Sequence, residues 1–208
     1  MGKWLSSWRL FWTLSLFISA IDSLELLRAD MHTSRGTVPV ILLAVRCALP
    51  LFLLAFTASS VALLWPGEPA RWLLSNRRYF GLAFAFGMGW HLAFVGYFFW
   101  AFGVHLNRTV IALDLIGLTF LLALTVTSFR WVSRRLSPRS WRRLHKSGVY
   151  AIWLLATYIY AESVRWGADA FNLTALIILL AAWGLRLTAW LHRLQARRGS
   201  AQSNQVSL

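Results

Sequence analysis

Six long apolar runs, separated by short polar segments, dominate the hydrophobic pattern of the chain. Each run holds about 20 residues or more, the length that an α-helix needs to cross the hydrocarbon core of a bilayer. Pro and Gly punctuate the polar segment 65–78, which we interpret as a connector. The pattern predicts an all-α membrane protein, a bundle of six transmembrane helices within residues 1–195, with spans at about 8–27, 37–64, 79–102, 110–129, 144–163 and 171–191.

Composition and charge agree with a membrane protein and set its orientation. Hydrophobic residues make up 58% of the chain, and the net charge is +14. Of the 21 Lys and Arg residues, 15 lie in the amino terminus, the tail and the two segments 65–78 and 130–146, whereas 4 lie in the other segments. This positive-inside bias predicts that both termini are cytoplasmic. Because the charges are confined to short segments between apolar runs, we expect no nucleic-acid partner.

The carboxyl-terminal tail, Asp22 and the single cysteine carry further expectations. Residues 196–208 are small and polar, which predicts a disordered cytoplasmic tail. Asp22 lies near the far end of the first run, where we expect it at the membrane interface. Cys47 is the single cysteine of the chain, so an intrachain disulfide is excluded.

His91 lies deep inside the third run, which reads RRYFGLAFAFGMGWHLAFVGY over residues 77–97. An ionisable or metal-binding side chain at membrane depth is costly, so it is a candidate functional residue. Gly87 lies one turn earlier on the same helical face, where the missing side chain leaves room for a wide, flat group such as a haem. Alternatively, the glycines of this run serve close helix packing and His91 hydrogen-bonds a neighbouring helix.

His145 is the second candidate, at the start of the fifth run and directly after Arg142 and Arg143. Neutral imidazoles on two helices can fill both axial positions of a b-type haem, so His91 and His145 are the candidate metal ligands. The alternative is that His145 is an interface histidine in a basic segment.

Two stretches of the chain, residues 77–97 and 127–160, resemble the ferric reductase-like transmembrane domain family and, within it, the haem-binding membrane subunits called MsrQ. The resemblance covers about residues 77–163, and it implies a ferric reductase-like six-helix fold in a bacterial inner membrane. It also implies haem b as the cofactor, with flavin only through a partner protein. The residues that carry it are Arg77, Arg78, Gly81, Leu82, His91, Thr127, Ser128, Leu136, Trp141, Leu144, His145 and Tyr150.

The chain departs from the MsrQ pattern at Tyr158, where that pattern has a further histidine. By helical rise, His91 and Tyr158 both lie about 20 Å from the inner ends of their helices, whereas His145 lies only about 3 Å from its end. A haem at the His91 level would be five-coordinate, ligated by Tyr158, or lifted to His145 by helix tilt. Alternatively, Tyr158 is an ordinary buried tyrosine whose hydroxyl meets a group such as Glu162.

Arg46 is a cation near the middle of the second run, where a charge needs a partner. We hypothesise that it pairs with a haem propionate; the alternative is a structural pair with a carboxylate or with backbone carbonyls. Arg186, near the inner end of the last run, is expected to extend to the interface.

These observations predict a membrane subunit that transfers electrons across the bilayer through bound b-type haem. The resemblance implies that electrons enter from a cytoplasmic flavin reductase or from quinol and leave on the outer face. The basic segment 130–146 is a candidate dock for an acidic reductase surface, although topology and contact with anionic membrane lipid explain most of its charge. The resemblance implies a periplasmic molybdenum enzyme as acceptor. No dinucleotide-binding motif or phosphate-binding loop occurs in the chain, so we expect no dehydrogenase module of its own. Two alternatives remain: a haem-free bundle that is an assembly partner or small transporter, and an oxidoreductase with an open haem position.

Overall fold

The computed structural model describes residues 7–103, 108–167 and 169–206, and this part of the chain folds into α-helices without any β-strand. Long apolar stretches form helices because a helix satisfies its backbone hydrogen bonds within itself, which is required where no water is present. The helices are α1 (Trp8–Arg28), α2 (Ser34–Leu64), α3 (Glu68–Phe102), α4 (Arg108–Ser128), α5 (Arg130–Ser133), α6 (Pro138–Arg165) and α7 (Ala170–Val206).

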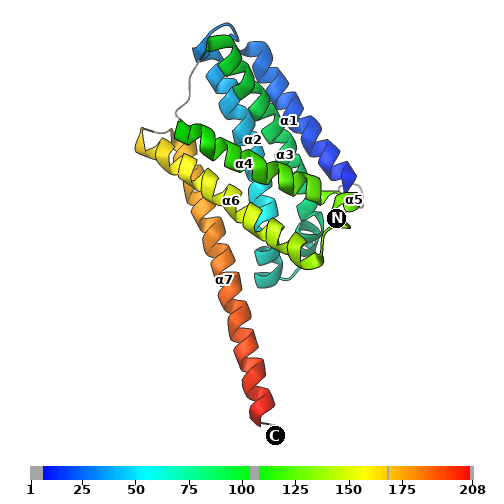
Figure 1. The fold of residues 1–208 in the computed structure, drawn as a ribbon. Helices are drawn as coiled ribbons and strands as arrows, with labels where there is room; N and C mark the ends of the chain where they lie inside the picture. The colour runs from blue at the N-terminus through cyan, green and yellow to red at the C-terminus, as the bar shows by residue number, and fades with distance from the viewer. Residues whose placement is uncertain (1–6, 104–107, 168, 207–208) are drawn as a thin grey trace.

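Two groups of helices build the bundle. Helices α1, α2 and α3 pack together, with the most extensive contact between α2 and α3. Helices α4 and α6 pair with each other and cross this group obliquely (Figure 1). Helix α7 contacts both α6 and α2, and its carboxyl-terminal half projects beyond the bundle (Figure 1).

Five helical stretches of the described residues are long and apolar enough to cross a membrane: α1, α2, α3, Ile111–Ser128 of α4 and Ala170–Ala196 of α7. The chain is thus an all-helical integral membrane protein. The predicted span 144–163 lies within α6, which is not among the five. Helix α6 begins with Arg and Lys residues, and its apolar part is rich in Tyr and Trp, which lowers its hydropathy. The count of six spans therefore stays a prediction.

The polar segments are more helical than their composition predicts. The interpretation of 65–78 as a connector is wrong for most of its length, because α3 begins at Glu68, with Gly67 as its N-cap residue and a proline in the first turn. Proline is favoured at this position, where its missing N–H leaves no bond unmade. The basic segment 130–146 contains α5 and the first turns of α6. Helix α7 continues through 196–206, where the sequence predicts disorder, since extending an existing helix is far easier than nucleating one.

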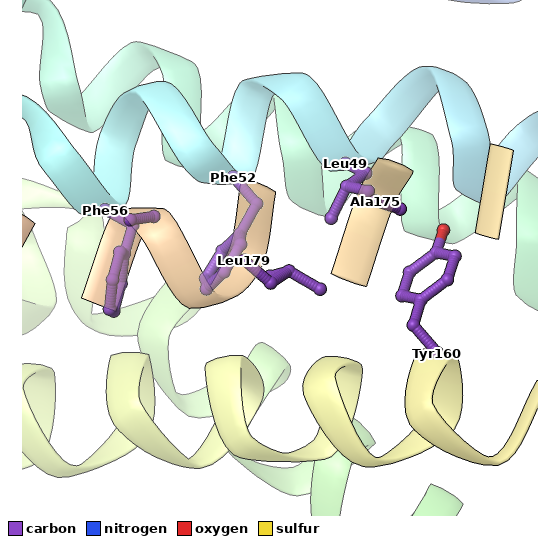
Figure 2. Close-up of a cluster of buried hydrophobic side chains, with 7 residues drawn as sticks. Leu49, Phe52, Phe56, Tyr160, Ala175 and Leu179 are labelled. Atoms are coloured by element: carbon purple, nitrogen blue, oxygen red, sulfur yellow. The ribbon is translucent and has the colours of Figure 1, made fainter. Parts of the chain in front are cut away.

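A cluster of buried side chains joins α2, α6 and α7. Phe52 and Phe56 of α2 lie beside Leu179 of α7, and Tyr160 projects from α6 toward α2 (Figure 2). Arg186 of α7 lies against this cluster instead of extending to the interface. Its Nη1 donates a 2.7 Å hydrogen bond to the carbonyl oxygen of Phe56, and its guanidinium lies 4.3 Å from the centroid of the Phe56 ring.

Asp22, which the sequence predicts near the membrane interface, is fully buried among the helices, with an exposed fraction of 0%. It lies on the side of α1 that also carries the buried residues Ser15 and Ile18, which the packing of α1 against α2 and α3 covers. Neither carboxylate oxygen of Asp22 has a hydrogen-bond partner among the described residues. The sequence did not reveal this burial, because the distance of a residue from a helix end does not say which side of the helix is covered.

Candidate cofactor cavity

A cavity of about 670 Å³ lies among α2, α3, α4, α6 and α7. Its walls are mostly aliphatic and aromatic side chains, which include Leu49, Phe52, Phe84 and Leu118. Cofactor-binding cavities of proteins commonly hold roughly 300–1,000 Å³ and combine apolar walls with a few polar groups. The polar side chains on the walls of this cavity are Arg46, His91, Asp114, Tyr160, Ser163 and Asn172.

His91 lines the cavity from α3. Its Nδ1 lies 3.1 Å from the carbonyl oxygen of Ile41 on α2. A carbonyl can only accept, so this contact assigns the proton to Nδ1 and leaves the lone pair on Nε2. A metal-binding histidine characteristically donates a hydrogen bond from the N–H of its other ring nitrogen to such a carbonyl or to a carboxylate. The same contact is the hydrogen bond to a neighbouring helix that the alternative interpretation of His91 predicts, so the ligand role stays a prediction.

Asp114 of α4 is a cavity residue that our reading of the sequence missed. It lines the cavity together with His91, and the two side chains are close enough to interact electrostatically. The signal was present, since Asp114 is the one acidic residue of the apolar run 110–129. An ionisable residue inside such a run is a candidate functional residue in its own right.

Tyr158 does not reach the cavity. Tyr158 is 49% exposed and lines an adjoining groove of about 480 Å³ between α4 and α6, which shares Asp114 and Ser163 with the cavity wall. Its expected partner Glu162 instead accepts a 3.1 Å hydrogen bond from Nε1 of Trp166. The α6 tyrosine that lines the cavity is Tyr160, two residues further on. Both residues lie in the same apolar run, so only the rotation of α6 about its axis separates their roles.

His145 is also absent from the cavity walls. Its Nε2 lies 3.1 Å from Oγ1 of Thr127, and its ring lies 4.3 Å from that of Trp141. Thr127 is 13 residues beyond Asp114 on α4, a rise of about 20 Å, so His145 lies far from His91 along the bundle. The structure does not bring the two predicted metal ligands together. In the described part of the chain, no three His, Cys, Asp or Glu side chains gather as a metal site.

Arg46 reaches the cavity and has a protein partner. Its Nη2 lies 2.5 Å from Oδ2 of Asp169, and its guanidinium lies 4.6 Å from the centroid of the Phe171 ring. Asp169 precedes α7 and is half-exposed. The backbone N–H of Asn172 and the guanidinium of Arg46 hold the pKa of the Asp169 carboxyl below its usual range. The structure therefore pairs Arg46 with a carboxylate of the protein, as in the structural alternative.

Gly87 faces the neighbouring helices and is not part of the cavity wall. A Cβ at this position would lie 3.1 Å from Cβ of Ala48 on α2 and 3.4 Å from Cδ1 of Ile18 on α1. Its missing side chain thus serves the close packing of α3 against α2 and α1, which was the alternative interpretation.

The fold and the cavity define a helical integral membrane protein with an internal, largely apolar site that presents one oriented imidazole. Over 79 residues the chain is 37% identical to the "Protein-methionine-sulfoxide reductase heme-binding subunit MsrQ" of Yersinia pseudotuberculosis serotype O:1b (strain IP 31758). The same identity and length are found with the MsrQ proteins of Yersinia pestis (strain Pestoides F) and Yersinia pestis bv. Antiqua (strain Angola).

These matches cover 36% of this chain and 37–38% of the relatives. The chain therefore matches little more than a third of the length of these curated relatives, and similarity to MsrQ is supported for that part. No family model matches the sequence, and no solved structure matches the fold. The wider ferric reductase-like class stays a prediction.

Proposed function

We propose that this chain is a haem-binding membrane subunit that transfers electrons across the bilayer. The observation that carries the proposal is the position of His91, which lies on the wall of a cofactor-sized cavity with Nδ1 at the Ile41 carbonyl. The similarity to proteins named as haem-binding MsrQ subunits supports it independently. A b-type haem held in this cavity would supply a one-electron redox centre inside the membrane.

The side chains of the cavity suit such a group. Nε2 of His91 is the nitrogen that can bind iron, and the apolar walls from α2, α3 and α4 exclude water from a macrocycle. Neither His145 nor Tyr158 lines the cavity, so His91 is the single imidazole on its wall among the residues that the structure describes. This arrangement also favours the second candidate function, an oxidoreductase whose haem keeps one position open to a small molecule. Binding of cyanide or carbon monoxide would distinguish it from a carrier with both axial positions filled.

The exposed basic surface of residues 130–146 and the names of the similar proteins suggest which partners the proposed subunit has. The seven Lys and Arg residues of 130–146 are all exposed, on α5, on the first turns of α6 and on the turn between them. This surface suits an acidic cytoplasmic flavin reductase, while quinol is the alternative electron donor. At the outer face, a periplasmic methionine sulfoxide reductase is the proposed acceptor, because the relatives are named for that system. We also propose that the chain crosses the membrane six times, with both termini in the cytoplasm.

The proposal is tested by the dithionite-reduced minus oxidised spectrum of the protein purified in detergent. We expect a b-type signal that His91→Ala abolishes, because this substitution removes the iron ligand. The matched control is His192→Ala, which removes an exposed imidazole on α7 and should leave the signal unchanged. A parent protein without haem, or a signal equally strong in His91→Ala, would contradict the proposal and favour the haem-free alternative.

Two further variants test the second axial position. His145→Ala should leave the reduced spectrum unchanged, since His145 contacts Thr127 far from the cavity. Tyr158→His should not create a second axial ligand, since Tyr158 faces the groove between α4 and α6. A low-spin spectrum that appears only in Tyr158→His would show that α6 turns this position toward the haem.

A further inference from the structure

The hydroxyl of Tyr160 is a buried polar group without a partner, on the wall of the cavity. Tyr160 is 7% exposed, and among the described residues its hydroxyl oxygen has no hydrogen bond. Figure 2 shows the ring projecting from α6 with its hydroxyl directed toward α2. A buried hydroxyl that makes no hydrogen bond destabilises the fold, so groups of this kind usually serve a ligand or a water.

The guanidinium of Arg46 lies at the same end of the cavity as Tyr160, with Phe171 in contact with both. The ring of Phe171, the second residue of α7, is 6.4 Å from the Tyr160 ring and lies under the guanidinium of Arg46 at 4.6 Å. Tyr160 and Arg46 both line the cavity, and Asn172 adds a side-chain amide at the same end. The guanidinium has five N–H donors, and one of its nitrogens is engaged by Asp169. Donors therefore collect where α6 ends and α7 begins, whereas the remaining walls are mostly apolar.

We propose that Tyr160 and Arg46 form a carboxylate-binding site at the α6–α7 end of the cavity, for a ligand with an apolar body and a carboxylate group. A guanidinium fork and a hydroxyl donor match the two oxygens of a carboxylate, and the apolar walls match the body. The ion pair with Asp169 shows that the Arg46 guanidinium can bind a carboxylate. Since Asp169 is half-exposed and remains solvated when released, it can yield the guanidinium to a carboxylate that enters from the cavity.

The identity of the occupant rests on the proposed function. If the cavity holds haem, the carboxylate is a propionate, and Tyr160 and Arg46 position the macrocycle relative to His91. If it holds a lipid, the same site takes the headgroup of a fatty acid. Both ligands present a carboxylate on an apolar body, so one experiment with two ligand pairs distinguishes the sources.

The experiment measures binding to the full chain in nanodiscs of neutral lipid. The first pair of probes is metal-free protoporphyrin IX and its dimethyl ester, followed by porphyrin fluorescence. The second pair is palmitic acid and methyl palmitate, followed by displacement of the porphyrin. In at least one of the two pairs, we expect the acid to bind about tenfold more tightly than its ester. This ratio of affinities corresponds to the free energy of about one charge-assisted hydrogen bond. A preference in the porphyrin pair indicates haem, and a preference in the palmitate pair alone indicates a lipid.

Point variants assign the preference to the two residues. Tyr160→Phe, which removes only the hydroxyl, and Arg46→Gln should bring the acid close to the affinity of its ester. Tyr158→Phe is the matched control and should change nothing, since this tyrosine lies outside the cavity. Asp169→Asn should tighten binding of the acid, because it removes the carboxylate that competes for Arg46.

Equal affinities of acid and ester in both pairs, or an acid preference that survives Tyr160→Phe and Arg46→Gln, would overturn the carboxylate site. Circular dichroism of each variant shows that the helices are retained. The probes contain no iron, so the acid preference is measured independently of the haem spectrum. Failure of the haem proposal and failure of the carboxylate site are therefore distinguishable.

Discussion

Asp22 shows at the scale of one residue how a polar group at membrane depth is tolerated. Its carboxyl group is fully buried in α1, and both oxygens lack hydrogen-bond partners among the described residues. Ser15, two turns earlier, likewise has a buried hydroxyl oxygen without a partner. Buried polar groups of this kind reduce the free energy of unfolding, so α1 is held by apolar contacts and not by these polar groups.

Asp22→Asn should raise the thermal midpoint of the detergent-solubilised protein. The amide has nearly the same volume and cannot ionise, so it removes the cost of an uncompensated buried charge; a gain of about 1–3 kcal/mol corresponds to about 2–12 °C for a chain of this size. Fluorescence-monitored thermal unfolding measures the change. Glu25→Gln, on the partly exposed side of α1, is the control and should shift the midpoint little. A lower midpoint in Asp22→Asn would indicate that the carboxylate has a function in the folded protein.

The ion pair of Arg46 and Asp169 should contribute little to stability, because Asp169 is half-exposed and water screens the attraction. Asp169→Asn should lower the thermal midpoint by about 2 °C or less at neutral pH. The pKa of Asp169 is lowered, so the contribution is complete above its ordinary value of 3.8 and is lost as the pH falls through the lowered folded-state pKa. Midpoints measured from pH 7 to pH 3 should therefore converge for the parent and the variant. If the difference in midpoint between the parent and Asp169→Asn grew as the pH fell, the predicted stabilising effect of the ionised Asp169 would be contradicted.

At the scale of elements, small residues decide how closely the helices approach each other. Gly87 brings α3 against Ala48 of α2, and Gly117 brings α4 against Leu155 of α6. Membrane helices pack through such positions because lipid supplies no hydrophobic force between them. Gly89, two residues from Gly87, faces open space, with no atom within 4 Å of the position of a Cβ.

Gly87→Leu should therefore disrupt the contact of α2 and α3, whereas Gly89→Leu should be tolerated. The Leu side chain at position 87 would begin 3.1 Å from Ala48, with its remaining atoms directed into the helix interface. We expect Gly87→Leu to lower the thermal midpoint by several degrees, since overpacking costs about 1–3 kcal/mol. Size-exclusion profiles after heating compare the two variants. If Gly87→Leu and Gly89→Leu lowered the thermal midpoint equally, the helix propensity of the new residue, and not the contact of α2 with α3, would explain the change.

At the scale of the whole molecule, the position of α6 decides the topology. If α6 crosses the bilayer, the chain has six spans and its termini share one side; if it does not, the five stretches of sufficient hydropathy place the termini on opposite sides. The antiparallel pairing of α6 with α4 and its contact with α7 favour the crossing.

Cysteine labelling of oriented membrane vesicles tests the crossing of α6. In a Cys47→Ala background, Ser137→Cys lies at the amino-terminal end of α6 and Ala170→Cys lies just beyond its carboxyl-terminal end, and both positions are exposed. A membrane-impermeant maleimide should label Ala170→Cys only from the outer face and Ser137→Cys only from the cytoplasmic face. Ser34→Cys, at the exposed start of α2, reports the outer face as a control. Labelling of positions 137 and 170 from the same face would exclude a sixth span.

Much of the fold followed from the sequence alone. The ends of α1, α2 and α4 lie within about three residues of the predicted runs, because run length and backbone hydrogen bonding in an apolar medium leave little choice there. The sequence also singled out His91, which lines the cavity, because an ionisable residue in such a run is rare. The sequence was less reliable in polar segments, where α3 and α6 begin earlier than the hydropathy indicates.

The tertiary structure decided which side chains face one another. Tyr158 and Tyr160 are two residues apart, about 200° around α6, and only the packing of α6 on α4 and α7 turns Tyr160 inward. Likewise, the sequence shows a cation at Arg46 but not its partner Asp169, which is 123 residues away. Hydropathy measures the free energy of moving a segment into lipid, which hardly depends on rotation about the helix axis. The composition of the cavity depends on that rotation, so the cavity is a property of the packed bundle.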